Sequence, residues 1–365
     1  MINVTKTYLP SLKEYTKYLK DIWDKGQVTN NGLLVKELES KLKKYLGIKH
    51  LILVSNGTTA LQIAIKSLGL KKEIITTPFS FVATTSSIVW ENCKPIFVDI
   101  NPDTLNIDSD KIEKAITKNT EAILVTHIFG NPCNIEKIQK IAKKHNLKII
   151  YDAAHTFGVK YKKKALVNYG DISILSFHAT KIFHTIEGGA IATNDDKLAK
   201  KIKYMRNFGI QDQENFCGLG INGKNSEFHA AMGLCVLPEI SKIIKYRKKI
   251  SKLYDNLLMT KKLSIRKPQI KSDTLYNYPY YPIILPSEEI LLKIKKELNK
   301  KNIFPRRYFY PSLNKLDYVK YKPMENTENI SERILCLPLY YELEEKKVKQ
   351  ISNITINILE QKKPL

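Results

Sequence analysis

The amino-acid sequence predicts an α/β fold, with a large domain built on a mostly parallel mixed sheet flanked by helices and a smaller C-terminal α/β domain. From about residue 50 to residue 195, short apolar runs alternate with amphipathic stretches, which is typical of repeated β–α units. The apolar runs are continuous, as expected for strands that helices cover on both faces. After Asn194 the pattern changes to a long helical stretch over residues 226–257, and then to mixed strands and helices.

The first part of the chain supplies the predicted strands of that sheet. The run HLILV at residues 50–54 precedes the segment TTALQIAIKSL, which places Leu61, Ala64 and Ile65 on one helical face. Further strands are predicted at EIITT, PIFVD, AILVTH, LKIIYD, ISILSF and GAIAT. We place the domain boundary at residue 240. This gives a large domain of residues 1–240, which includes an N-terminal helical segment, and a small domain of residues 241–365.

The composition is that of an ordinary soluble globular protein. Of the 365 residues, 43% are hydrophobic and 26% are charged. The N-terminus has no basic segment followed by an apolar core, and no apolar run reaches the length of a membrane span. The five cysteines are scattered and lack a CxxC motif, which argues against a disulfide framework and against a zinc site. We therefore expect a cytoplasmic enzyme with no metal and no membrane partner.

The formal charge of +24 raises the question of a nucleic-acid partner. The lysines are spread through almost every predicted helix, as in KELESKLKKY and KKIKYM. Aromatic residues are not interleaved with them, as they are on platforms that bind single strands. A solvated basic surface is therefore favoured over a polynucleotide groove. The same charge would help to attract an anionic ligand such as a nucleotide diphosphate.

Two glycine-containing segments have the letters of phosphate-binding loops. The segment SNGTTA at residues 55–60 lies between a predicted strand and a helix, so its backbone N–H groups suit a phosphate, although any capped turn would look similar. The segment GLGING at residues 218–223 fits the GxGxxG pattern. It follows the polar stretch QDQENFC rather than a strand, so we reject it as a dinucleotide-binding fingerprint.

One aspartate and one lysine follow neighbouring predicted strands. Asp152 ends the run LKIIYD, and Lys181 lies just beyond ISILSF. Taken singly, Asp152 fits a helix cap and Lys181 fits a surface lysine. Together they match what pyridoxal phosphate (PLP) needs, a lysine for its aldehyde and an anion that keeps its pyridine nitrogen protonated. The phosphate would then lie on the backbone amides of Thr58 and Thr59 and on the Ser176 hydroxyl.

At this level of detail the sequence resembles the DegT-type nucleotide-sugar aminotransferases of PLP fold type I, the aspartate aminotransferase-like fold. The resemblance covers essentially the whole chain. It is carried by QVTNNGLLVKELE, VSNGTTALQIA, TTPFSFVATTSSI, KPIFVDINPDTLNID, HIFGNPCNIE, YDAAHTFG, SFHATKIFHTIEGGAIATND, GINGKNSEFHAAMGL and ISERILCLPLY. It implies a PLP enzyme that takes the amino group of L-glutamate and passes it to a nucleotide-linked keto sugar.

The resemblance also implies roles for individual residues. The residues implied to act in catalysis are Lys181, which bonds to the cofactor and then shuttles protons, Asp152 at the pyridine nitrogen, and His155 over one face of the ring. The residues implied to complete the cofactor site are Phe81 on the other face, Thr58, Thr59 and Ser176 at the phosphate, and Asn222 from a neighbouring subunit, which makes the protein a homodimer with shared sites. Relatives often have glutamine at the position of His155 and Arg-Met at Lys224-Asn225. The protonation of His155 and the exact contact across the subunits are therefore open.

The resemblance further implies amination at C4 of a dTDP-linked 4-keto-6-deoxyglucose, for an O-antigen or similar surface polysaccharide. Enzymes that act at C3 more often have Tyr-Pro or Phe-Pro at His178-Ala179 and a different residue at Glu187. The candidate substrate residues are His178 and His184 (with Phe183) near Lys181, and Arg306, Arg307, Tyr308 and Tyr310 (with Phe309) in the small domain.

Four other functions stay open on the sequence alone. A C3 aminotransferase and a PLP-dependent sugar dehydratase would share the scaffold. A histidine replaces the lysine in such dehydratases, so Lys181 argues against that activity. A non-catalytic PLP-binding regulator, or a nucleic-acid binder, belongs to another class, and no helix-turn-helix signature supports it.

Overall fold

A large central sheet organises the protein. The computed structural model describes residues 1–259 and 263–361, and within these residues the largest sheet has seven strands in the order β2-β10-β9-β6-β5-β3-β4. In chain order these strands are β2 (His50–Val54), β3 (Glu73–Thr76), β4 (Lys94–Phe97), β5 (Thr120–Thr126), β6 (Lys148–Asp152), β9 (Ile172–Ser176) and β10 (Gly189–Thr193). Each corresponds to one of the apolar runs, and the predicted α/β class is confirmed.

Strand β10 is the exception to the parallel arrangement. It pairs antiparallel with both β2 and β9, whereas the pairs β9–β6, β6–β5, β5–β3 and β3–β4 are parallel. Both faces of the sheet are buried, because Ile52 and Val54 enter one apolar cluster and Leu51 and Leu53 enter another. This burial explains why the runs are continuously apolar rather than alternating.

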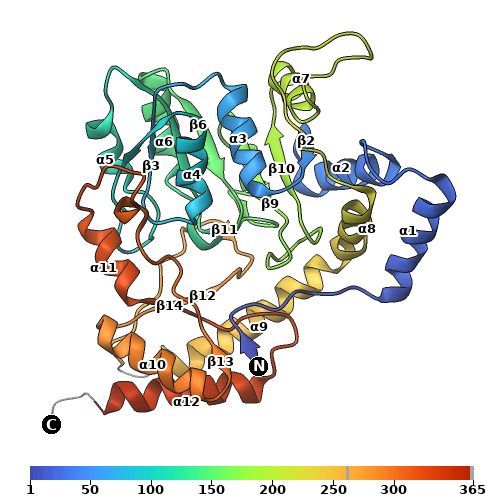
Figure 1. Ribbon diagram of the computed structural model, residues 1–365. Helices are drawn as coiled ribbons and strands as arrows, with labels where there is room; N and C mark the ends of the chain where they lie inside the picture. The colour runs from blue at the N-terminus through green and yellow to red at the C-terminus, as the bar shows by residue number, and fades with distance from the viewer. Residues whose placement is uncertain (260–262, 362–365) are drawn as a thin grey trace.

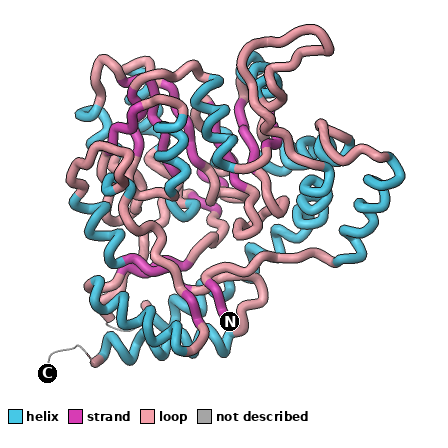
Figure 2. The backbone as a smooth tube through the Cα atoms, in the orientation of Figure 1, coloured by secondary structure: helices cyan, strands magenta, loops and turns pink. Residues whose placement is uncertain are grey.

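Helices cover both faces of the sheet (Figures 1 and 2). Helices α3 and α7 share an apolar cluster with one face, and α2 and α8 share a cluster with the other, against which α1 also packs. The helices of this part are α1 (Leu12–Lys25), α2 (Leu33–Leu46), α3 (Gly57–Ser67), α4 (Val82–Trp90), α5 (Ser109–Ile112), α6 (Ile135–Lys144), α7 (Asp196–Met205) and α8 (Glu227–Val236). Short 3₁₀ turns lie at Glu113–Ala115, Ile128–Gly130 and Leu166–Asn168.

The long helical stretch predicted over residues 226–257 is present but interrupted. Helix α8 is followed by a 3₁₀ turn at Leu237–Glu239, and then by α9 (Ile240–Leu258). Pro238 lies in that turn and has no backbone N–H to donate to a continuous helix. Figure 1 shows α9 running from the sheet towards the C-terminal helices.

A separate apolar cluster holds the C-terminal part together. Strands β12 and β14 pair antiparallel, and α9, α10 and α12 pack with them. The elements are β11 (Thr274–Leu275), β12 (Tyr281–Ile284), α10 (Glu288–Lys300), β13 (Ile303–Phe304), a 3₁₀ turn (Leu313–Lys315), α11 (Glu325–Arg333), β14 (Ile334–Leu337) and α12 (Glu345–Glu360). The short strands β7 (Lys160–Tyr161) and β8 (Lys164–Ala165) form a small sheet with β11.

The two parts are not separated cleanly along the chain. Strand β1 (Ile2–Asn3), at the N-terminus, pairs with β13 in the C-terminal part. One apolar cluster also joins Val4 and Phe79 to Phe309 and Ile334. Helix α9 begins at the predicted boundary of residue 240, and the division into 1–240 and 241–365 stays a prediction.

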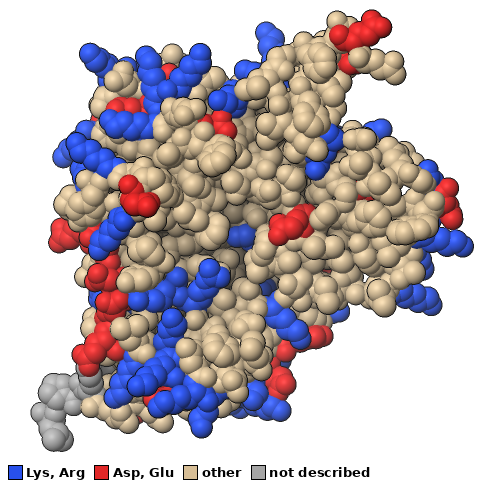
Figure 3. Space-filling view, in the orientation of Figure 1, with Lys and Arg blue, Asp and Glu red and all other residues tan. Residues whose placement is uncertain are grey.

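The surface agrees with a dispersed basic charge. On the face drawn in Figure 3, lysine and arginine side chains lie around much of the outline, interrupted by acidic and uncharged surface. None of the helices within residues 1–259 and 263–361 is long and apolar enough to cross a membrane.

Candidate active site

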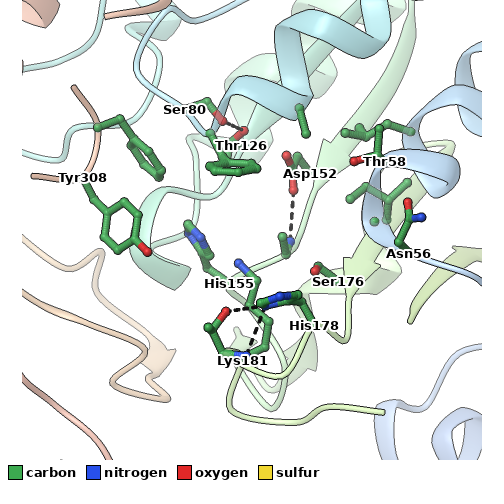
Figure 4. A pocket seen from close by; sticks show the side chains of 18 of the residues that line it. Asn56, Thr58, Ser80, Thr126, Asp152, His155, Ser176, His178, Lys181 and Tyr308 are labelled. Atoms are coloured by element: carbon green, nitrogen blue, oxygen red, sulfur yellow. Dashed lines mark hydrogen bonds between the residues drawn. The ribbon is translucent and has the colours of Figure 1, made fainter. Parts of the chain in front are cut away.

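The carboxyl ends of the parallel strands β5, β6 and β9 meet beside one cavity of about 280 Å³. Thr126 ends β5, Asp152 ends β6 and Ser176 ends β9, and all three line the cavity (Figure 4). Thr126 and Asp152 are register partners in the sheet. Lys181 follows Ser176 in the loop before β10 and lines the same cavity. Ligand sites in α/β sheets lie at this edge, because the loops after the strands converge there.

The N-terminus of α3 forms one wall of the cavity. Asn56 caps the helix by accepting a hydrogen bond from the Thr59 amide at 2.8 Å. Thr58 and Ser176 both line the cavity at this helix end, where the first-turn N–H groups have no partner within the helix. A Cβ atom on Gly57 would lie 3.0 Å from the Ser176 Cβ, so glycine lets the turn approach β9. This wall combines backbone N–H groups with two hydroxyls, which suits a phosphate.

Asp152 is a buried carboxylate with two hydrogen-bond donors. Its side chain is 5% exposed, the Thr84 hydroxyl donates to Oδ2 at 2.8 Å, and the Ala154 amide donates to Oδ1 at 3.1 Å. Burial raises the pKa of Asp152 above its usual range. The hydrogen bonds from Thr84 and Ala154, and the charge of Lys181, lower that pKa in turn. In a pocket that water hardly reaches, the charged form of this carboxyl therefore depends on those donors and on Lys181.

Lys181 and His155 share the low-dielectric part of the cavity. Burial lowers the pKa of Lys181 to about 8, although the nearby Asp152 carboxylate raises it. Burial, followed by the charge of Lys181, holds the pKa of His155 well below its usual range, so the imidazole is neutral. Its Nδ1 has no hydrogen-bond partner among the described residues. The ring lies parallel to Phe309 at 6.0 Å and edge-on to Tyr280 at 5.1 Å.

Further side chains lie around the rest of the cavity. His178 Nε2 lies 3.5 Å from Glu187 Oε1, and the two side chains are 47% and 55% exposed. Arg306 lies over the Tyr308 ring at 4.7 Å, and both residues line the cavity. Phe81, the residue before α4, also lines it and is 51% exposed. This part is more open than the surroundings of Asp152.

Several predicted site residues are not part of the cavity lining. Arg307 forms an ion pair with Glu288 at 2.6 Å and lies over the Tyr310 ring, so both of these predicted substrate residues face away. His184 is buried and its Nε2 bonds to the Tyr8 carbonyl at 2.6 Å. The structure does not bring Arg307, Tyr310 or His184 to the cavity. Their contacts with substrate stay predictions. Two further residues are not part of the lining. Thr59 is half-buried and its amide donates to Asn56, and Phe183 is buried and stacks on Phe157.

Asn222 also lies outside the cavity of its own subunit. It belongs to the loop between α7 and α8, which extends from the body of the molecule in Figure 1. The same loop exposes large apolar side chains, including Phe216 at 71% and Leu219 at 69%. Exposed apolar side chains on a protruding loop are typical of a surface that contacts another protein.

The residues present fit PLP. Asp152 would hold the pyridine nitrogen, Lys181 would bond to the aldehyde carbon, and Thr58 and Ser176 would hold the phosphate. An anion, an amine of lowered pKa and a helix N-terminus around one cavity provide what the charged groups of this cofactor need. Within residues 1–259 and 263–361, no group of three or more His, Cys, Asp or Glu side chains is placed to hold a metal ion.

The structure adds residues that were not singled out from the sequence. Ser80, Thr126 and Tyr280 line the cavity, and Thr84 lies directly behind Asp152. Thr126 ends the predicted strand AILVTH, so its place at the site could have been inferred from that position. Tyr280 comes from the C-terminal part of the chain, and no local pattern around it indicates a site.

Comparison with known proteins places this arrangement in a family. A model described as the DegT/DnrJ/EryC1/StrS aminotransferase family matches residues 11–355. The chain is 43% identical over 351 residues to dTDP-4-amino-4,6-dideoxy-D-glucose transaminase of Shigella dysenteriae, over 94% of this chain and 95% of that protein. It is 40% identical over 365 residues to an Escherichia coli protein of the same name, over 97% of this chain and 98% of that protein.

A solved structure is similar along almost the whole chain. It is described as DesI in the presence of its TDP-sugar product. The two chains share a TM-score of 0.93 and 28% sequence identity, over 99% of this chain and 93% of DesI. The similarity therefore includes both the sheet with its helices and the C-terminal part.

Proposed function

We infer the function from the premise that this chain belongs to the DegT/DnrJ/EryC1/StrS aminotransferase family, and is thus a PLP-dependent aminotransferase. We propose that it transfers the amino group of L-glutamate to C4 of dTDP-4-dehydro-6-deoxy-D-glucose. The product would be dTDP-4-amino-4,6-dideoxy-D-glucose, the sugar named for two relatives at 43% and 40% identity. We further propose that the reaction takes place in the cytoplasm and supplies a surface polysaccharide such as an O-antigen.

The observation that carries the proposal is the presence of Lys181 and Asp152 in one cavity, between a phosphate-binding wall and an open mouth. When bound there, PLP supplies an aldehyde that accepts an amino group and a protonated ring that withdraws electrons from the reacting carbon. Lys181, with a pKa of about 8, can take up and return a proton near neutral pH. The buried rings of His155 and Phe309 exclude water from that side of the cavity.

The mouth of the cavity suits an anionic sugar nucleotide. Arg306 is the one arginine that lines the cavity among the described residues, and its guanidinium is exposed at the mouth. A guanidinium can hold a diphosphate through paired hydrogen bonds. His178 and Glu187 lie on the loop that carries Lys181 and can hydrogen-bond sugar hydroxyls near the reacting carbon. We propose that these residues decide which carbon of the sugar is aminated.

Substrate identity is tested directly by product analysis. The purified holoenzyme is incubated with L-glutamate and a panel of dTDP-, UDP- and GDP-linked keto sugars. Its yellow colour should fade with glutamate alone, because the amino group passes to the cofactor first. The dTDP-linked 4-keto-6-deoxy sugar should then restore the colour and yield nitrogen on C4 by NMR. Nitrogen on C3, or no turnover of any 4-keto sugar, would overturn the substrate proposal.

We propose that two copies of the chain share their sites, with Asn222 of one subunit reaching the cofactor phosphate of the other. The exposed loop with Phe216 and Leu219 supports this arrangement. In mixed dimers of Lys181→Ala and Asn222→Ala subunits, one site then combines an intact Lys181 with an intact Asn222. Mixing the two inactive proteins should restore activity. No recovery, or a fully active monomer in sedimentation experiments, would rule out shared sites.

A further inference from the structure

Three buried hydroxyls lie in a row beside the carboxylate of Asp152. The Ser80 hydroxyl lies 2.8 Å from the Thr84 hydroxyl and 2.8 Å from the Thr126 hydroxyl. The Thr84 hydroxyl in turn donates to Asp152 Oδ2 at 2.8 Å. The three side chains are at most 2% exposed. They come from the loop after β3, from α4 and from the end of β5, so the row exists only in the folded protein.

The direction of these hydrogen bonds follows from counting protons. A carboxylate can only accept, and a hydroxyl has one proton to donate. Thr84 gives its proton to Asp152, so Ser80 has to donate to Thr84. The Thr126 hydroxyl lies beside both Ser80 and Asp152, and its proton can go to either of them. Every proton of the row then points towards the carboxylate. Hydrogen bonds to a charged acceptor are the strong ones, and a chain of this kind strengthens each member.

We propose that Thr84 is a positioning residue for the cofactor, which keeps Asp152 ionised and fixes its orientation towards the cavity. Asp152 has lost almost all contact with water, so hydrogen bonds from the protein have to stabilise its charge. Thr84 is the donor that lowers the pKa of Asp152 most, ahead of the Ala154 amide and the Thr126 hydroxyl. Thr84 does not line the cavity itself, and therefore acts through Asp152. The inference rests on the cofactor lying against Asp152, and is independent of the sugar substrate.

The chain provides a matched control at the next position of the same helix. Thr85 is also fully buried, and its hydroxyl has no hydrogen-bond partner among the described residues. Threonine and valine are close in shape, so replacing either threonine with valine removes one hydroxyl and leaves the packing nearly intact. Thr84→Val removes a hydroxyl that donates to Asp152, whereas Thr85→Val removes one that does not.

The test measures the dissociation constant of PLP for the apoprotein as a function of pH. A carboxyl that has lost its donor is protonated at higher pH, so Thr84→Val should move the acid limit of PLP binding to higher pH. It should also weaken PLP binding about tenfold near neutral pH, as expected for a lost hydrogen bond to a charge. Thr84→Ser should restore the parent profile, and Thr85→Val should leave it unchanged. Ser80→Ala, one hydrogen bond further away, should cause a smaller shift in the same direction.

The other titrating groups at the cavity are the same in all these variants. They are Lys181, His155, His178, Glu187 and the two tyrosines Tyr280 and Tyr308, together with the permanently charged Arg306. A parent-like profile for Thr84→Val would overturn the proposal, as would an equal shift in Thr85→Val. If Thr84→Val does not fold in urea titrations, Ser80→Ala and Thr84→Ser still decide the question, and an unshifted Ser80→Ala would then overturn it. Asp152→Asn serves as the reference, because unchanged PLP binding in that variant would instead show that the cofactor lies elsewhere.

Discussion

The cofactor end and the mouth of the cavity are built in different ways. At the cofactor end, Asp152 is 5% exposed, lies at the end of a central strand and has donors on both carboxylate oxygens. At the mouth, His178 and Glu187 have side chains that are about half exposed and come from a loop. Arg306 is exposed as well, and no carboxylate among the described residues pairs with it within ion-pair distance.

This difference shows which side chains the fold holds in fixed positions. A side chain at the end of a buried strand is held by the sheet and by its hydrogen bonds, so its position is set before any ligand binds. Side chains on exposed loops adapt more easily, and loops carry the features that distinguish related sites. We therefore expect the cofactor end to define the chemistry and the mouth to decide which substrate enters. The following predictions test this division, starting with the largest expected effect.

Lys181→Ala should have the largest effect. The variant should still bind PLP through Asp152 and through the wall formed by Thr58 and Ser176. It cannot bond to the aldehyde or transfer a proton to the reacting carbon. We expect a loss of turnover of at least about a thousandfold, in the range attributed to a positioned acid–base group. Borohydride reduction and peptide mapping of the parent protein should tag Lys181. Lys197→Ala, at an exposed position of α7, should behave as the parent, and a tag on any lysine other than Lys181 would contradict the assignment.

Asp152→Asn should fold and lose about a hundredfold in turnover, because an amide cannot hold the pyridine nitrogen protonated. The loss should appear in kcat rather than in the KM of the sugar nucleotide, since Asp152 lies at the cofactor end. Single-turnover measurements with glutamate alone would show the defect without the sugar. A variant with near-normal kcat would contradict the placement of Asp152 at the cofactor end of the cavity.

Arg306→Gln should raise the KM of the sugar nucleotide about tenfold and change kcat little. The expected size is that of an exposed hydrogen bond to a charged group. The matched control is Arg307→Gln, because Arg307 is paired with Glu288 and lies outside the cavity. That variant should lower the free energy of unfolding by roughly 1–3 kcal/mol and leave KM unchanged. Equal effects of both variants on KM would show that the mouth extends beyond the cavity described.

The pH dependence of cofactor attachment should show the smallest effect. Only the neutral amine of Lys181 reacts with an aldehyde, and burial lowers its pKa to about 8. From pH 7 to pH 8 the neutral fraction of such an amine rises about fivefold, and it levels off above that range. The rate at which PLP bonds to the apoprotein, followed by visible absorbance, should follow this curve. A rate that keeps rising towards pH 10 would indicate a lysine with an ordinary pKa.

Much of the fold could be predicted from the sequence, because the strands are short, apolar and separated by amphipathic helices. Each of the seven apolar runs became a strand of the sheet, and Asp152 and Lys181 follow neighbouring strands β6 and β9 as expected. Proximity at the strand ends is a consequence of parallel pairing, so those residues could be grouped before any coordinates existed. The interruption at Pro238 and the antiparallel direction of β10 needed the structure.

The residues at the mouth of the cavity were harder to predict from the sequence, because loop residues have no periodicity that fixes where their side chains point. Arg306 and Arg307 are adjacent in the chain, yet the first lines the cavity and the second pairs with Glu288. Likewise His178 lines the cavity, whereas His184 is buried against the Tyr8 carbonyl. Spacing in the sequence does not distinguish the members of either pair, since neighbouring side chains on a loop can point in opposite directions.

The sequence by itself determined the α/β class, the strands of the central sheet and the grouping of Lys181 with Asp152 at neighbouring strand ends, because periodicity and motif order are local properties of the chain. The tertiary structure alone decided which loop side chains face the cavity and which hydroxyls support the buried carboxylate. Ser80 and Thr84 are neighbours at the start of α4, but they meet Thr126 and Asp152 only after α4 has packed on the sheet. Burial then removes the water that would otherwise stabilise Asp152, and makes those hydroxyls the groups that stabilise its charge.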